Sequence, residues 1–202
     1  EKKSCDCNIV LIGAIVLDNI INIDEIGMEP NGWNIASDYQ YDLGGICSTL
    51  ITLQNLGGTA KILGWMGNDA NSSIVLEKMK DYKIDISGIE QNNIDTTTVI
   101  AFIDPTGNHS RVVLPANNII DSVPLSWNKS IKDADFVFLS GFTCIELKRE
   151  IILEILDIAK RAKVAIVFDP QNAISVIDDE ILLSVLKLTK ILTINEEEKQ
   201  TL

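Results

Sequence analysis

Two kinds of apolar segment alternate along this chain, and this alternation constrains the fold more than any other feature. Runs that are apolar throughout are typical of buried parallel strands, and they cover residues 7–17, 60–67, 134–141, 163–170 and 189–195. Between them, apolar residues recur every three or four positions, as in helices that pack on one face, over residues 46–56, 71–82, 146–162 and 178–188. We therefore predict an α/β fold with a doubly wound, mostly parallel sheet and helices on both faces.

Two segments interrupt the alternation. Residues 20–43 carry neither pattern, and residues 96–115 contain two strand-like runs around the turn residues Pro-Thr-Gly-Asn-His at 105–109, which is typical of a hairpin. We expect both segments to be inserted in a single α/β domain spanning residues 1–202, and to form a small accessory sheet.

The charge balance narrows the possible partners. The chain has 29 acidic and 17 basic residues, a net charge of −12, whereas proteins that bind nucleic-acid phosphates concentrate Lys and Arg. No apolar run approaches the ~18–20 residues that cross a bilayer, and no apolar stretch of signal-peptide length precedes Gly13. We expect a soluble, cytoplasmic protein with no nucleic-acid or membrane partner.

The four cysteines do not form a zinc pattern. Cys5 and Cys7 make a C-x-C pair, but no second Cys or His pair lies nearby and the single histidine is His109. We expect reduced thiols with a structural or incidental role and a solvent-facing His109.

Polar residues and glycines at the ends of the predicted strands are the candidate site residues, because ligands of open α/β sheets bind beyond the carboxyl ends of the strands. Asp18 follows the first strand, where a turn or cap role is the alternative. Gly44 and Gly45 open the first helix, so that a ligand can approach the backbone closely; a tight turn explains them equally well. Neither G-x-G-x-x-G nor G-x-x-x-x-G-K-[ST] occurs in the chain, which argues against classical NAD binding and a P-loop.

The last two predicted strands end on acids and an amide. Asp169 follows the strand 163–170, and Asn195 and Glu198 follow the strand 189–195. Three residues apart, Asn195 and Glu198 share a face of the helix that begins there, which suits an outer-shell magnesium site with water between protein and ion. The alternative is an N-cap followed by acids that stabilise the helix dipole.

The order and spacing of these motifs over essentially the whole chain resemble the ribokinase-like carbohydrate kinases of the phosphofructokinase-B (PfkB) family. The stretch Gly-Gly-Ile-Cys-Ser-Thr at 44–49 is similar to its two-glycine signature, Gly-Trp-Met-Gly-Asn-Asp at 64–69 to its G-x-x-G-D-D turn, and Asn-Glu-Glu-Glu at 195–198 to its N-x-x-E motif. The resemblance also includes Asp18, Gly107 and Arg111 of the hairpin, Gly141, and Asp169-Pro170.

The resemblance implies a kinase that transfers the γ-phosphoryl group of ATP to a hydroxyl of a sugar, nucleoside or related small molecule. It implies that the segments at 20–43 and 96–115 form a β lid, through which such proteins often dimerise, and that the loop 28–43 and the hairpin select the substrate. Asp18, Gly44, Gly45 and the residue at position 49 would contact that substrate. Arg111 would reach an anionic substrate, with an exposed strand-edge charge as the alternative.

By the same resemblance, Asn195, Glu198 and Asp169 would organise Mg²⁺ and phosphate through water, with no direct metal ligand among them.

Three departures from the family pattern qualify this expectation. Thr49 stands where the family has Asn, and Asn68 and Ser72 replace an acid and a glycine of the turn motif. The motif G-A-G-D, which carries the family's anion hole and catalytic Asp, does not occur in these 202 residues. We therefore expect a piece of a longer protein whose catalytic Asp lies beyond Leu202, and an inactive 202-residue chain. The alternative is a catalytically inactive ligand-binding or scaffold relative.

Overall fold

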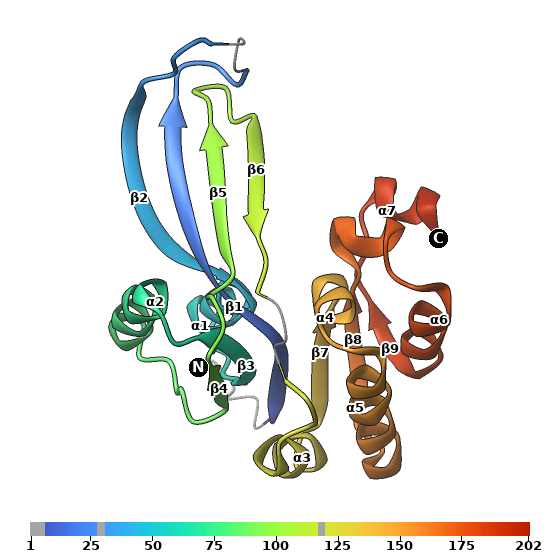
Figure 1. Ribbon diagram of the computed structural model, residues 1–202. Coiled ribbons are helices and arrows are strands. Elements are labelled where there is room, and N and C mark those ends of the chain that lie inside the picture. The colour runs from blue at the N-terminus through green and yellow to red at the C-terminus, as the bar shows by residue number, and fades with distance from the viewer. Residues whose placement is uncertain (1–6, 28–30, 117–119) are drawn as a thin grey trace.

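The computed structural model describes residues 7–27, 31–116 and 120–202 and has a doubly wound parallel sheet at its centre (Figure 1). Its strands lie in the order β4-β3-β1-β7-β8-β9. All neighbouring pairs in this series are parallel. Their bounds are β4 Ile89–Asn92, β3 Lys61–Gly67, β1 Ile9–Ile23, β7 Phe136–Ser140, β8 Ala165–Asp169 and β9 Thr189–Leu192.

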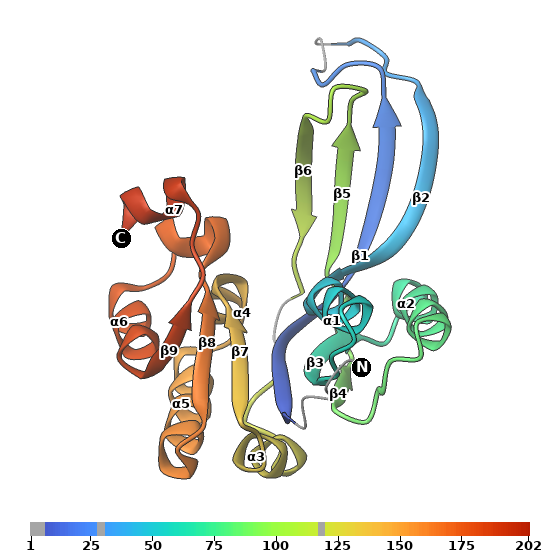
Figure 2. The same ribbon diagram turned by 180° about the vertical axis from the view of Figure 1, so that it is seen from behind.

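Helices cover both faces of this sheet, because alternate residues of β1 point to opposite sides. Leu11 and Ile15 face a core built with α1 (Ile46–Asn55) and α2 (Ala70–Asp81). Val10 and Ile12 face a larger core that includes residues of the helices on the other side, and these are α3 (Leu125–Lys132), α5 (Arg149–Ala162) and α6 (Asp179–Leu188). The two helical layers are seen from opposite sides in Figures 1 and 2.

A second sheet, which we call the projecting sheet, stands above the main one (Figure 2). It consists of the second half of β1 together with β2 (Ala36–Gly45), β5 (Thr98–Ile103) and β6 (His109–Leu114). The predicted segments 20–43 and 96–115 lie in this sheet, apart from residues 28–30, which are outside the described residues. The first strand was predicted to end at residue 17; it continues to Ile23 because Leu17–Asn22 pair with both β2 and β5.

The remaining differences from the predicted elements have local causes. The helix predicted at 146–162 begins three residues later, as α5, because Leu147 and Lys148 have extended backbone with ψ near 145°. The separate helix α4 (Gly141–Glu146) before it was not predicted. The 3₁₀ helix η1 (Gln171–Ser175), α3 and the short β4 were not predicted. The strand predicted at 189–195 ends at Leu192, and α7 (Glu196–Thr201) follows Asn195.

The cysteines, the edge strand and the helix lengths can also be compared with the sequence predictions. Cys47 and Cys144 are buried free thiols, whereas Cys5 lies outside the described residues. The edge strand β9 leaves Ile191 and Leu192 partly exposed. Along the described part of the chain, no helix has the length and apolarity that a bilayer crossing requires.

The turn after β3 ties the main sheet to the projecting sheet through Asp69. Its Oδ1 accepts hydrogen bonds from the Ser72 amide (2.8 Å) and from the Thr96 hydroxyl (2.6 Å), and its Oδ2 accepts one from the Thr96 amide (2.9 Å). The Ser72 Oγ accepts a hydrogen bond from the Asp69 amide (3.0 Å), which completes a capping box at the start of α2, and the hydroxyl also donates to the Asp69 carbonyl. Of residues 64–69, Gly64–Gly67 belong to β3, and only Asn68 and Asp69 form the turn into α2. Ser72 has a structural reason for standing where the family has glycine.

Replacing Asp69 by Ala should lower the free energy of unfolding by about 2–3 kcal/mol. The change removes the α2 cap and leaves the buried Thr96 without its partner. Urea unfolding followed by circular dichroism measures this loss, with Asp81→Ala at the other end of α2 as the control of equal charge. If Asp69→Ala cost no more than Asp81→Ala, the link to Thr96 would have no energetic role.

Candidate functional site

The candidate residues gather at one edge of the main sheet, where the parallel strands end. The chain proceeds from β1 to β3 and β4 in one direction and then to β7, β8 and β9 in the other. This reversal makes the carboxyl ends of β1 and β7 the switch point, the usual ligand position in such sheets. At this edge β1 continues upward into the projecting sheet, while α4, η1 and α7 follow the other strands.

Asp18 lies on β1 within the projecting sheet, opposite Asp42 of β2. The carboxyl is half-buried, and burial raises its pKa from 3.8 to about 6. The positive charge of Arg111 acts against this shift, whereas the negative charge of Asp42 adds to it. At pH 7 Asp18 is therefore mostly ionised, but its charge is incompletely solvated, and hydrogen-bond donors of a ligand would stabilise it.

Gly44 and Gly45 lie beside Asp18, and the absence of side chains there leaves room for its carboxylate. A Cβ atom on Gly44 would lie 2.3 Å from Asp18 Oδ1, so the carboxylate rests on backbone that only glycine leaves open. Gly45 has φ of 59°, in the left-handed region, and a Cβ there would lie 2.4 Å from the Ala14 carbonyl oxygen. It is the N-cap of α1, with no side-chain hydrogen bond to that cap. The first-turn amides of α1 therefore receive no capping hydrogen bond from the Gly45 position.

Arg111 and Thr49 have different surroundings. Arg111 pairs with Ala101, and the registers of the projecting sheet place it on the same face as Asp18. Thr49 lies one turn into α1 and lines a shallow groove of about 380 Å³ with Ser48, Thr52, Leu53 and Leu56. The structure therefore brings Arg111 to Asp18 but places Thr49 along the flank of the helix. His109, at the start of β6, is exposed as expected.

Asn195 and Glu198 bind each other at the start of α7. Asn195 donates its backbone amide to Glu198 Oε2 (3.0 Å) and its side-chain amide to Oε1 (2.8 Å), and it accepts the Glu198 amide (2.8 Å). Glu198 is only 8% exposed. The capping interpretation is thus confirmed, and both carboxylate oxygens already have a protein donor.

Asp169, at the end of β8, lies close enough to Glu198 for their charges to interact. The pKa of Asp169 is raised, mainly by burial and also by the negative charge of Glu198. A hydrogen bond from the Gln171 amide to Oδ1 (3.2 Å) acts in the opposite direction. In the ranges 7–27, 31–116 and 120–202, no group of three or more His, Cys, Asp or Glu side chains is arranged to hold a metal directly.

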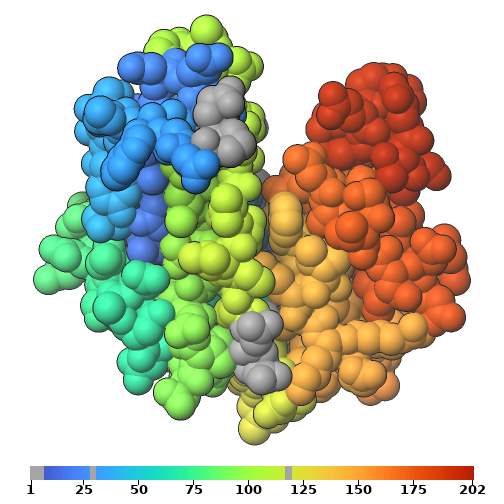
Figure 3. All heavy atoms as spheres, turned by 45° about the horizontal axis from the view of Figure 1, so that its top comes forward, coloured from blue at the N-terminus to red at the C-terminus, as the bar shows by residue number. Residues whose placement is uncertain are grey.

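The site residues thus form two groups. Asp18, Gly44, Gly45 and Arg111 belong to the base of the projecting sheet, and Asp169, Asn195 and Glu198 to the ends of β8 and β9. A hollow separates the projecting sheet from the surface formed by η1, α6 and α7 (Figure 3). The first group belongs to the projecting sheet on one side of this hollow, and α7, which begins after Asn195, lies on the other side.

Three polar residues of this edge were missed by the sequence analysis. Asp42 directly precedes the glycine region, so its position was a usable signal. Thr143 of α4 donates its hydroxyl to the Ile12 carbonyl (2.8 Å), where β1 leaves β7. Burial raises the pKa of Glu146 to about 7, and its Oε2 has no hydrogen-bond partner among the described residues. The sequence carried no sign of either residue: Thr143 lies between two predicted elements, and Glu146 was the first residue of a helix predicted by apolar spacing alone.

Comparison with known proteins assigns this architecture to one family. The model of the "pfkB family carbohydrate kinase" matches residues 7–202. Similar solved structures include a nucleoside kinase of Methanocaldococcus jannaschii, an archaeal member of the ribokinase family. It is 22% identical with a TM-score of 0.70, and the match covers 98% of this chain and 63% of that one.

Two further relatives share this similarity. The Arabidopsis thaliana ribokinase complexed with ribose and ATP is 16% identical with a TM-score of 0.63, and the match covers 98% of this chain and 67% of that one. The bifunctional protein HldE of Koribacter versatilis (strain Ellin345) is 20% identical over 182 residues, 85% of this chain and 37% of the relative. The chain thus spans about two thirds of the two solved kinases and about a third of the curated relative.

Replacing Asp18 by Asn should stabilise the protein in a pH-dependent manner. Because the folded-state pKa is raised to about 6, ionisation of Asp18 costs stability as the pH rises through that value, and no such cost exists below about pH 4. The variant should gain roughly 1–2 kcal/mol above pH 7, after allowing for partial solvent screening, and almost nothing at pH 4. Urea unfolding between pH 4 and 8 measures the difference, with Asp38→Asn on the same sheet as control. A gain that did not change with pH would contradict the raised pKa.

Proposed function

Because the chain belongs to the pfkB family of carbohydrate kinases, we propose that the intact protein transfers the γ-phosphoryl group of ATP to a hydroxyl group of a sugar or nucleoside. The observation that carries this proposal is the half-buried Asp18 carboxyl, which lies against Gly44 beside the first turn of α1. A half-buried carboxyl beside the first turn of a helix suits a ligand that carries several hydroxyl groups. The related proteins act on such ligands: one is a nucleoside kinase, and another is complexed with ribose and ATP.

In this proposal the base of the projecting sheet binds the acceptor substrate. Asp18 accepts hydrogen bonds from substrate hydroxyls, and the backbone of Gly44 and Gly45 and the first-turn amides of α1 contact its oxygen atoms. Thr49 is one turn farther along α1, so its hydroxyl can contact only a substrate that extends along the helix. Arg111, on the same face as Asp18, attracts any anionic group that the substrate carries.

The second group orients ATP and Mg²⁺. Magnesium, when bound, neutralises charge on the transferring phosphoryl group. Asn195 and Glu198 fit an outer-shell role, because both carboxylate oxygens of Glu198 already accept hydrogen bonds and Mg²⁺ retains several waters. Asp169, which lies within the electrostatic reach of Glu198, adds negative charge to the same water-filled region. None of these residues is assigned the role of general base for the acceptor hydroxyl.

The projecting sheet is proposed to act as a lid and as a dimer interface. On the face opposite Asp18, the strand registers collect Ile21, Tyr39, Ile100, Val112 and Leu114. Val112 and Leu114 are about half exposed. An apolar face of this kind is typical of an interaction surface, and a second copy of the chain would cover it symmetrically.

A catalytically inactive binding or scaffold relative is the second candidate. Thr49 favours it, since a hydroxyl replaces the family's amide at a substrate-contacting position. Ser72 no longer does, because it completes the α2 capping box. The assay below distinguishes the two candidates.

Ribose- or nucleoside-dependent ATP turnover by the intact protein should fall by roughly 10- to 100-fold in kcat/KM when Asp18 is replaced by Asn. The estimate corresponds to the loss of hydrogen bonds to a charged acceptor. A coupled ADP-release assay over a panel of sugars and nucleosides measures the loss, and Asp38→Asn is the matched control. Turnover that Asp18→Asn leaves intact would refute the assigned role of Asp18. Absence of turnover, with binding of the same sugars shown by calorimetry, would favour the inactive relative.

Light scattering after size exclusion should give about twice the mass of one chain, and Val112→Lys should give a monomer. The lysine places a charge on the apolar face of the projecting sheet, at its edge strand β6. Lys80→Gln on α2 serves as a surface control. A wild-type protein that elutes strictly as a monomer would exclude the interface.

A further inference from the structure

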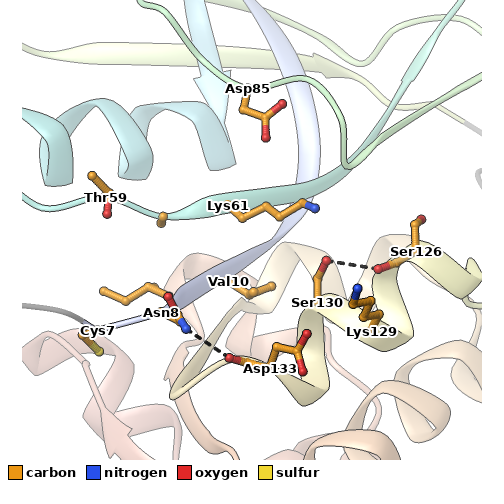
Figure 4. Close-up of a pocket in the computed structure, with 12 residues that line it drawn as sticks. Cys7, Asn8, Val10, Thr59, Lys61, Asp85, Ser126, Lys129, Ser130 and Asp133 are labelled. Atoms are coloured by element: carbon orange, nitrogen blue, oxygen red, sulfur yellow. Dashed lines mark hydrogen bonds between the residues drawn. The ribbon is translucent and has the colours of Figure 1, made fainter.

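A second cavity lies at the opposite edge of the main sheet, where β1 and β3 begin. Its volume is about 590 Å³, within the usual range of small-molecule sites. The first residues of β1 and β3 form one wall and α3 forms the facing wall (Figure 4). Val10 of β1 lines this cavity, eight residues before Asp18, which puts the two sites about 26 Å apart along the strand. The cavity is therefore separate from the site proposed for phosphoryl transfer.

Two lysines from facing walls reach into this cavity. Lys61 is the first residue of β3, Lys129 lies on α3, and Figure 4 shows both side chains extending into the space between these elements. Throughout the described residues, neither ammonium group has a carboxylate within ion-pair distance. Asp85 and Asp133 line the same cavity, so the formal charges of its lining are balanced. The pKa of Asp85 is lowered by its hydrogen bonds from Ser87 and also by the charge of Lys61. Two ammonium groups that have no direct ion pair can still hold an anion between them.

Hydroxyl groups lie beside the lysines. Thr59 and Ser126 also line the cavity, and among the described residues their hydroxyls have no hydrogen-bond acceptor. Ser130, the third hydroxyl, donates to the Ser126 carbonyl at 3.0 Å. A phosphate or carboxylate held by two ammonium groups would find additional donors in Thr59 and Ser126.

Two carboxylates of the cavity, those of Asp85 and Asp133, limit the charge that the remainder of a bound ligand can carry. Asp85 accepts from the amide and the hydroxyl of Ser87, both at 2.9 Å, and keeps acceptor capacity toward the cavity. Asp133, at the end of α3, has its carbonyl bound by Asn8 at 3.3 Å and leaves its carboxylate at the cavity wall (Figure 4). A ligand that were anionic throughout would be repelled by these two carboxylates, whereas hydroxyl groups would donate to them.

We propose that this cavity binds a small hydroxylated anion, such as a sugar phosphate or a hydroxy acid, with its anionic group between Lys61 and Lys129 and its hydroxyls toward Asp85 and Asp133. The site is independent of the proposed kinase activity. Trp127, two residues before Lys129, donates its indole N–H to the Gly88 carbonyl (2.9 Å) and packs 6.3 Å from Trp65 between ring centroids. Its fluorescence is therefore a local reporter of binding.

The test uses inorganic phosphate and glycerol 3-phosphate as probes at constant ionic strength. Tryptophan fluorescence and the melting temperature are recorded for the wild type, for Lys61→Gln/Lys129→Gln and for the control Lys132→Gln/Lys80→Gln, which has the same charge change outside the cavity. We expect saturable binding of both probes and a higher affinity for glycerol 3-phosphate. The cavity variant should weaken the affinity at least about tenfold, as expected for lost charge-assisted hydrogen bonds.

Three results would overturn the proposal. The first is a melting temperature that rises with phosphate equally in both double variants, since ion exclusion alone produces such a rise. The second is equal affinity for the two probes, which would remove the role of the hydroxyl groups. The third is no saturable response in the wild type. Because none of these measurements depends on turnover, failure here leaves the kinase proposal untouched, and the reverse also holds.

Discussion

The backbone hydrogen bonds of β1 serve two sheets, and the positions of the other elements depend on this sharing. The first part of the strand pairs with β3 and β7 inside the main sheet, and its second part pairs with β2 and β5 in the projecting sheet. A strand of 15 residues is stable here because it has a partner on each edge over most of its length. Asp18 is held rigidly for the same reason, since its segment of β1 is paired with β2 on one edge and with β5 on the other.

The polar groups at the carboxyl edge are held by two different means. Asn195 and Glu198 satisfy each other, so they are fixed before any ligand arrives. Asp18 and Glu146 instead carry a desolvation cost, which the raised pKa values record. Groups of the first kind suit positioning through water, and groups of the second kind suit a direct partner. In the proposed function, Asn195 and Glu198, of the first kind, lie on the ATP side, and Asp18, of the second kind, lies on the substrate side.

The sequence was sufficient for the class of fold, because apolar spacing fixes which residues share a face. It also located Gly44, Gly45 and Asn195–Glu198, where backbone geometry limits the residue types allowed. It could not give the length of β1: Asp18, Asn19 and Asn22 break the apolar run, and only pairing with β2 and β5 keeps them in a strand. The break between α4 and α5 has no proline or glycine to mark it. Thr49 was placed by motif spacing, which does not specify the side of the helix on which a hydroxyl points.

The pairing of β1 also determines where the molecule can bend. On one edge, β7 pairs with β1 only as far as Ile12, and β5 begins to pair at Leu17. Residues 13–16 thus form a short bridge with a strand partner on one side only, and it starts at a glycine. A tilt of the upper sheet against the lower one would have to bend β1 at these four residues, its hinge, and would also strain the hydrogen bonds from Thr96 to Asp69 that link the two sheets. Asp18 lies two residues above the hinge, so it would move with the upper sheet. Asn195 and Glu198 would stay with the lower sheet. The width of the hollow between the two groups would therefore depend on the tilt angle between the two sheets.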